Sequence, residues 1–222
     1  MGNGPSLDLV DFEKLKSSSV MTFACNKISK LCREKDWHPD FYTAFFAEPF
    51  RGTRYPGDIK RATLAREDIK YICGNMSTKC YLHEWYREFI NPQDNIEFHD
   101  PVLIDRHKKF DITSFSKFKT PDTFLWHIAV TPLFQLCFQM GVTEIGLIGQ
   151  DGYRIDKNNN HYSGYVGHEQ PIEKIKIGND RMIALHDAIQ NYSSRNSVSI
   201  FNLSEDSIIN HYPQMSIDKF LS

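Results

Sequence analysis

A helix-like segment that leads directly into a strand-like segment most limits what this chain can fold into. Residues 132–140 (PLFQLCFQM) form an apolar run that predicts a buried helix ending at Gly141. Residues 143–148 (TEIGLI) then predict a buried strand that ends at Gly149. A buried helix followed closely by a buried strand is typical of α/β proteins, in which crossover helices join parallel strands.

The same alternation continues along the rest of the chain. In order, the patterns predict a short helix (8–15), two strands (20–25 and 40–47), helical structure (68–90), an irregular basic and aromatic stretch (91–121), a helix (179–192) and a strand (197–202). We therefore expect one α/β domain over residues 1–222, with a Rossmann-like, doubly wound, mostly parallel sheet and helices on both faces. Ligands of such sheets bind at the carboxyl ends of the strands, here at Asn26, residues 149–153 and Asn202.

Composition excludes several classes of protein. The 222 residues are 41% hydrophobic and 24% charged, as in an ordinary globular domain, and the net charge of -2 supplies no basic field for nucleic acid. No apolar run approaches the roughly 20 residues that span a bilayer, and no signal-peptide pattern opens the sequence, so we expect a cytoplasmic protein. The five cysteines have no C-x-x-C spacing and are predicted to be free, buried thiols.

Two polar turns are candidates for ligand binding. Residues 2–7 (GNGPSL) form a glycine loop before a predicted helix, where backbone N–H groups can hold a phosphate or carboxylate; an ordinary tight turn explains the loop equally well. After the strand that ends at Gly149, Asp151 can accept hydrogen bonds from a ribose hydroxyl and Tyr153 can flank a phosphate. The alternative for this second turn is a turn aspartate with a surface tyrosine.

The polar segment beyond Asp151 is interpreted as a lid. Residues 158–168 (NNNHYSGYVGH) contain two histidines, two tyrosines and two glycines, which predicts a mobile loop over about 153–170 that carries a titratable base. His161 and His168 lack helical i, i+4 spacing and a third ligand, and the chain has no Asp-x-Asp pair, so no metal site is predicted. The other histidines receive no role.

Four short patches of the sequence resemble one family in their order and rough spacing. They are residues 2–7 (GNGPSL), 23–26 (FACN), 140–153 with the turn GQDGY at their end, and 165–168 (YVGH). These patches resemble the bacterial sialyltransferases of glycosyltransferase family 42, and the resemblance implies a GT-A-like variant of the Rossmann-like fold. The glycine loop, the turn GQD and the tail 201–221 are also similar to proteins of the 6-hydroxymethylpterin pyrophosphokinase-like family.

The resemblance to the sialyltransferases implies a site for a CMP-activated sugar. Asn3, Gly4 and Asn26 would contact the CMP part of the donor, and Asp151 would bind its ribose. In place of the family's Thr-Ser-Gly, the chain has VTPL, in which Thr131 is the partial counterpart. The donor-binding positions implied in this way are Gly2, Asn3, Gly4, Asn26, Thr131, Gly149 and Asp151.

The resemblance also implies how transfer would proceed. Tyr153 and Tyr162 would hydrogen-bond the leaving phosphate, and His168 would be the general base that takes the proton of the acceptor hydroxyl. The implied partners are the CMP-sugar donor, a glycan acceptor and further copies of the chain in a tetramer, with no metal or other cofactor. The location implied is cytoplasmic or peripheral to the inner membrane face.

Other interpretations of the same residues stay open. The sialyltransferases have an apolar strand before their glycine loop, so the resemblance predicts that a segment upstream of Met1 supplies a central strand. A pterin pyrophosphokinase-like transferase, which would need ATP and a divalent ion, is one alternative function. A non-catalytic relative that binds a nucleotide is another.

Overall fold

Helices and strands alternate along the protein, whose computed structural model describes residues 1–45, 59–100, 102–103, 125–126, 129–152 and 172–222. The elements are η1 (Pro5–Leu9), α1 (Phe12–Ser17), β1 (Phe23–Cys25), α2 (Ser29–Lys35), β2 (Phe41–Ala44), α3 (Ile59–Cys73), β3 (Lys79–His83), η4 (Glu84–Glu88), β4 (Ile96–His99), β5 (Val102–Leu103), β6 (Leu125–Trp126), α4 (Thr131–Gln139), β7 (Glu144–Leu147), α5 (Ile172–Arg195), β8 (Ser199–Asn202) and α6 (Ile217–Phe220). The labels η1 and η4 denote short 3-10 helices.

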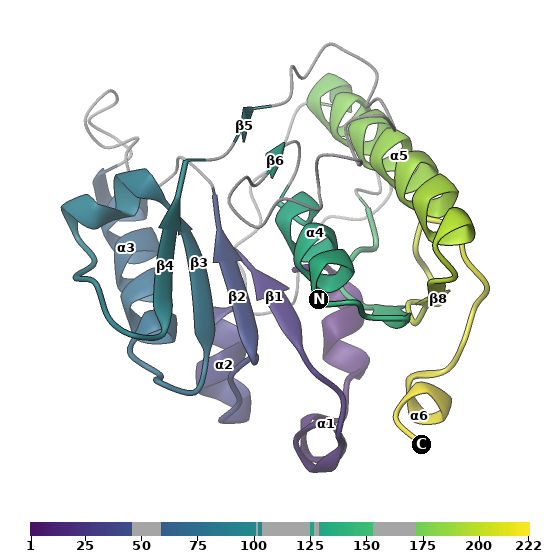
Figure 1. Ribbon diagram of the computed structural model, residues 1–222, viewed down its shortest axis with the longest axis horizontal. Helices are drawn as coiled ribbons and strands as arrows, with labels where there is room; N and C mark the ends of the chain where they lie inside the picture. The colour runs from purple at the N-terminus through teal and green to yellow at the C-terminus, as the bar shows by residue number, and fades with distance from the viewer. Residues whose placement is uncertain (46–58, 101, 104–124, 127–128, 153–171) are drawn as a thin grey trace.

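All the strand pairs in the described part of the chain are parallel. The main sheet has the order β1-β2-β3-β4, and β7 pairs with β8 in a second sheet (Figure 1). A third, two-stranded sheet is formed by β5 and β6. Parallel pairing requires crossover connections, and here helices such as α2 and α3 make them. The expected α/β class with a parallel sheet is therefore confirmed.

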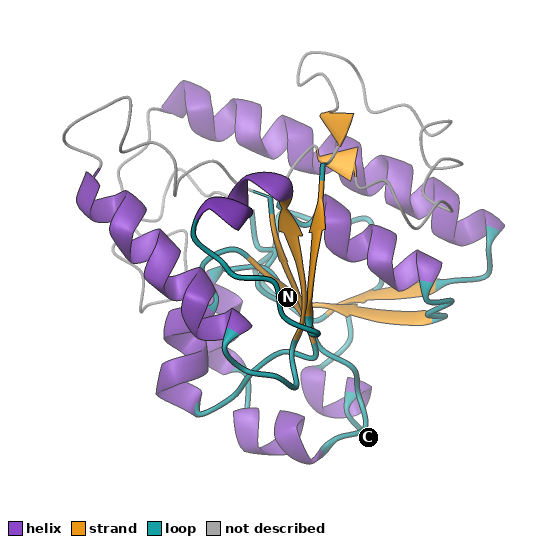
Figure 2. Cartoon of the chain, turned by 60° about the vertical axis from the view of Figure 1, so that its left-hand side comes forward, coloured by secondary structure: helices purple, strands orange, loops and turns teal. Residues whose placement is uncertain are grey.

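Helices cover both faces of the strands, as Figure 2 shows. One buried cluster joins η1, α1, α2 and α3 to inward side chains such as Tyr42 and Leu82. The other cluster joins α4 and α5 to the opposite face, at Phe23 and Cys25. Each cluster also includes side chains from the β7–β8 side, so the two parallel sheets share the same pair of hydrophobic layers.

The prediction of helical structure over residues 68–90 is wrong in its second half. The helix α3 ends at Cys73, and Lys79–His83 form the strand β3 between β2 and β4. The turn between them is held by the Asn95 side-chain amide, which donates to three backbone carbonyls at 3.0–3.1 Å, those of Cys73, Asn75 and Thr78. Since this amide satisfies carbonyls that a continuing helix would use, the helix stops there.

Other boundaries also differ from the sequence-based expectations. The stretch 91–121 was predicted to be irregular, yet it contains β4, which pairs with β3 in register Cys80↔Ile96. The predicted helix 8–15 is divided into η1 and α1, because the Asp11 carboxylate caps a new helix by accepting from the N–H groups of Glu13 and Lys14. The helix predicted over 179–192 lies within the longer α5.

The cysteines are free and buried, as predicted. Burial raises the pKa of Cys25 to about 11 and that of Cys137 to about 12, so neither thiol is ionised near neutral pH. No helix among the described residues combines the length and the hydropathy needed to cross a membrane.

Candidate functional site

The glycine loop 2–7 packs directly against the turn that follows β7. The Gly2 N–H donates to the Ile148 carbonyl and the Gly4 N–H to the Gly149 carbonyl, both at 2.8 Å. A Cβ atom on Gly2 would lie 2.1 Å from the Gly149 oxygen, and one on Gly4 would lie 2.3 Å from Asp151 Oδ2. Glycine is therefore required at both positions because the loop closely approaches the backbone of the turn at Gly2 and the Asp151 carboxylate at Gly4, not because φ is positive.

A buried polar network connects this loop to the ends of β7 and β8. Asp151 Oδ2 accepts from the Ser6 N–H at 2.8 Å, and Ser6 Oγ accepts from the Gly149 N–H at 2.8 Å. The Ser204 hydroxyl, which follows β8, donates to Ser6 Oγ at 2.8 Å. Gly149 itself has φ +71°, a conformation that favours glycine. Three segments far apart in the sequence thus meet in one hydrogen-bonded junction.

The expectation that the glycine loop offers free backbone N–H groups is wrong for four of its residues, one of which, Leu7, donates to the Gly4 carbonyl within the loop. Gly2 and Gly4 donate to carbonyls of the turn, and Ser6 donates to Asp151. Two side-chain acceptor atoms of the turn, Asp151 Oδ1 and Gln150 Oε1, are buried and have no hydrogen-bond partner among the described residues. The junction therefore holds buried acceptor oxygens, which can bond to hydroxyl groups, where the loop pattern predicted free N–H donors.

Asn26 and Asn3 lie together at the carboxyl end of β1. Asn26 directly follows the strand with φ 56°, and its backbone N–H donates to the Thr43 carbonyl at 3.1 Å. The Asn3 side-chain amide donates to the Cys25 carbonyl at 3.2 Å, one residue before Asn26. The Tyr42 hydroxyl donates to the Asn26 carbonyl at 2.6 Å, and burial raises the pKa of this tyrosine well above 10.0. The turn at Asn26 is therefore firmly held.

Thr131 is fully buried in the first turn of α4. Its neighbours Val130 and Leu133 belong to the same hydrophobic cluster as Cys25 and Phe45, which lie at the carboxyl ends of β1 and β2. The start of α4 is thus on the same edge of the sheet as Asn26. Three of the predicted positions, Tyr153, Tyr162 and His168, lie outside the described residues, as does the predicted lid over 153–170.

His83 is a residue at this edge that the sequence analysis assigned no role. It ends β3, is 4% exposed, and its Nδ1 accepts from the Trp85 N–H at 3.2 Å. The ring stacks on Trp85 at 4.0 Å between centroids, and burial lowers the pKa of the imidazole. The alternation of the buried Cys80 and Leu82 with half-buried neighbours was the available signal, because it marks a strand that ends at His83.

Within the described ranges, no three side chains of His, Cys, Asp or Glu lie close enough together to hold a metal ion. The junction instead consists of backbone groups, serine hydroxyls, asparagine amides and one carboxylate. Such a set suits recognition of hydroxyl and carbonyl groups on a small polar molecule. In comparisons with known proteins, no family model, curated protein or solved structure matches this chain significantly.

Proposed function

We propose that this chain is a metal-independent inverting glycosyltransferase that transfers sialic acid or a related sugar from a CMP-activated donor to a glycan hydroxyl. The observation that carries the proposal is the junction of residues 2–6 with the turn 149–151. The resemblance to family 42 sialyltransferases selected these patches by sequence alone, although about 145 residues separate them. Their direct contact, through the Ser6 N–H and Asp151 Oδ2 at 2.8 Å, supports a common role in one binding site.

Each donor-binding role fits the contacts of its residue. Asn3 and Asn26 sit at the end of β1, where their amides can recognise the cytosine ring and phosphate of CMP. Asp151 binds the ribose: Oδ2 is already held by the loop, and Oδ1 accepts from a ribose hydroxyl. Gly2, Gly4 and Gly149 let the loop pack against the turn that carries Asp151, and Thr131 contributes from the start of α4.

The reaction follows from the roles of three further residues. His168 takes the proton from the acceptor hydroxyl as that oxygen attacks the anomeric carbon, and the bond to the CMP phosphate breaks on the opposite face. Tyr153 and Tyr162 donate hydrogen bonds to the leaving phosphate and so stabilise the charge that develops there. Neutral donors of this kind allow departure of CMP with no metal ion.

The same proposal includes the finer details of the fold, the lid and the assembly. They are a doubly wound Rossmann-like sheet of GT-A-like type, a lid over about 153–170, one domain over 1–222 and a homotetramer. The enzyme works in the cytoplasm or against the inner face of the membrane, with a CMP-sugar and a glycan as its partners and no nucleic acid.

A thermal-shift panel tests the nucleotide. The chain is heated with CMP, CDP, UDP, GDP or ATP, each with and without magnesium. A ligand at about 100 times its dissociation constant adds roughly 2.7 kcal/mol, which raises the melting temperature by about 5–10 °C in a chain of this size. We expect a selective shift with CMP that needs no magnesium. A shift only with ATP and magnesium would contradict the proposal and favour the pterin pyrophosphokinase-like alternative.

Two matched pairs of variants test the residue roles. Asn3→Ala should reduce the CMP-induced shift, whereas Asn191→Ala, on the exposed side of α5, should leave it unchanged. His168→Ala should abolish transfer from a CMP-sialic acid donor and keep CMP binding, with His38→Ala as the control. Undiminished transfer by His168→Ala would remove that residue from the mechanism.

A further inference from the structure

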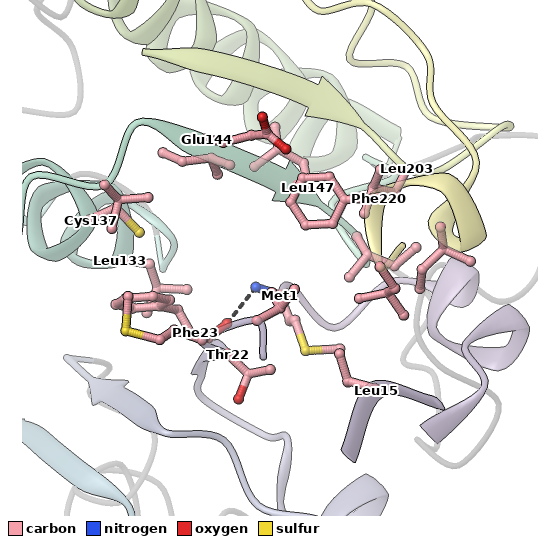
Figure 3. A pocket seen from close by; sticks show the side chains of 18 of the residues that line it. Met1, Leu15, Thr22, Phe23, Leu133, Cys137, Glu144, Leu147, Leu203 and Phe220 are labelled. Carbon is pink, nitrogen blue, oxygen red and sulfur yellow. Dashed lines mark hydrogen bonds between the residues drawn. The ribbon is translucent and has the colours of Figure 1, made fainter. Parts of the chain in front are cut away.

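An apolar cavity of about 270 Å³ lies between β1 and β7 and borders the junction described above at Met1 and Ile148. Its side chains come from both faces of the sheet, as Figure 3 shows: Leu133 and Cys137 of α4 on one face, and Leu15 of α1 and Phe220 of α6 on the other. The edges of the cavity are the strands themselves. We call this cavity the slot.

Backbone N–H and C=O groups of β1 and β7 point into the slot. On β1, Thr22 and Asn26 bond to β2, so the alternation of a strand directs Met21, Phe23 and Cys25 to the other side. Along β7 and the residue before it, the carbonyls of Thr143 and Leu147 accept from the N–H groups of Ser199 and Leu203, so Gly146 and Ile148 face the slot. A slot with apolar walls and two parallel strand edges has the form of a missing central strand.

The first two residues of the chain already form the last step of such a strand. The Met1 amine donates to the Phe23 carbonyl of β1 at 2.5 Å, drawn as a dashed line in Figure 3, and the Gly2 N–H donates to the Ile148 carbonyl beyond β7 at 2.8 Å. Consecutive N–H groups that bond to neighbours on opposite sides are the pattern of an inner parallel strand. These two bonds fix the direction and register of any strand that enters the slot.

We propose that the slot binds an extended apolar segment of about five residues that directly precedes Met1 in the polypeptide and runs parallel to β1 and β7. In this register, the residue before Met1 donates to the Gly146 carbonyl, and the residue before that one donates to the Met21 carbonyl. The segment joins the four-stranded sheet to β7 and β8, and it delivers the chain into the glycine loop at its carboxyl end.

Charge and burial agree with this occupant. Among the described residues that line the slot, Glu144 is the only one with a charged side chain, and it lies at the amino end of β7. The interior of the segment is therefore apolar and β-branched, and a basic residue suits its outer end. The Met1 amine is buried, and desolvation lowers its pKa, whereas a peptide N–H would make the same bond to Phe23 with no charge. The inference is independent of the proposed donor and reaction.

The test is a pair of extensions added before Met1 of the full chain. One extension is Lys-Val-Ile-Val-Val; the control is Lys-Val-Pro-Val-Pro, which has the same length but lacks the two N–H donors that would face β7. We expect the first to raise the melting temperature by about 5 °C or more relative to the control. Equal melting temperatures would overturn the proposal.

Hydrogen exchange gives a second measurement that does not depend on the melting temperature. The first extension should slow exchange at the slot-facing amides of Phe23 and Ile148 by about tenfold more than at Ala24, whose amide faces β2. Equal slowing at all three amides would overturn the proposal. So would a concentration-dependent dimer of the unextended chain in which the Phe23 and Ile148 amides are already protected, because a second copy would then fill the slot.

Discussion

The chain is loosely packed on one side of Gly2 and very tightly packed on the other. Toward Met1, the backbone enters a slot of about 270 Å³ with carbon-lined walls. Toward Ser6, the loop lies so close to the turn after β7 that a single Cβ on Gly2 would come within 2.1 Å of the Gly149 oxygen. Both regions depend on the same strand, β7, yet only one of them is filled.

The difference shows which contacts position the candidate site. The glycine loop is held by backbone bonds to Ile148 and Gly149 and by the Ser6 N–H bond to Asp151, and of these three partners only Ile148 also lines the slot. The site geometry is therefore set locally, by the turn. The slot instead separates β1 from β7. What fills it determines how firmly the four-stranded sheet is joined to the sheet of β7 and β8.

Substituting a loop glycine should have the largest effect. In Gly2→Ala the new methyl group meets the backbone of the turn, which cannot move away as a flexible side chain can, so we expect a loss of about 3–4 kcal/mol in the free energy of unfolding. The control is Gly141→Ala, where φ is +71° but no atom lies within 4 Å, and the expected loss is about 1 kcal/mol. Urea denaturation of both variants measures the difference. Similar losses would show that close packing at the loop is unimportant.

Core truncations compare the slot with a filled region. Leu82→Ala removes a fully buried side chain from the first cluster and should cost about 3–5 kcal/mol. Leu133→Ala should cost about 2–3 kcal/mol, because Leu133 borders the slot and has fewer neighbours to lose. The same denaturation experiment gives both values. A larger loss for Leu133 would mean that the slot is closed in solution.

Removing the serine hydroxyl of the junction should have a smaller effect. In Ser6→Ala the Gly149 N–H and the Ser204 hydroxyl lose their common partner while both stay buried, so we expect a loss of about 1–3 kcal/mol. The control Ser194→Ala removes an exposed hydroxyl on α5 that bonds to the Gln190 carbonyl and should change stability by less than about 0.5 kcal/mol. Thermal unfolding followed by circular dichroism distinguishes the two. An unchanged Ser6→Ala variant would show that water replaces the hydroxyl.

Local patterns in the sequence were sufficient for much of the fold. The helix predicted over 132–140 and the strand predicted over 143–148 are present as α4 and β7. Gly141 and Gly149 end them with positive φ angles, which glycine adopts easily because it has no Cβ. The strand β3 was missed because its five residues adjoin a real helix, and the break depends on Asn95, which is 17 residues away from Thr78. A side chain that caps a distant turn leaves no local pattern.

The sequence predicted where in the fold the candidate site lies, but not which hydrogen bonds connect its residues. Asn26, residues 149–153 and Asn202 are predicted at the carboxyl ends of strands, and the structure places Asn26, Asp151 and Asn202 there. The use of the loop N–H groups was not foreseen, because the partners of Gly4 and Ser6 lie about 145 residues away. Pairing across such a separation is decided by sheet order, which periodicity does not contain.

The smallest predicted effect concerns the Met1 amine, where the slot and the loop meet. Desolvation lowers its pKa below the ordinary 8.0, so the unfolded chain binds a proton more readily, and stability falls as the pH drops below 8.0. Acetylation of this amine removes the charge and keeps an N–H to donate to Phe23. The acetylated chain, with the modification verified by intact mass, should therefore be more stable than the free amine at pH 6.5, and the gap should narrow toward pH 8.5. Parallel stability curves over this range would place the free amine in water and contradict its burial at the end of the slot.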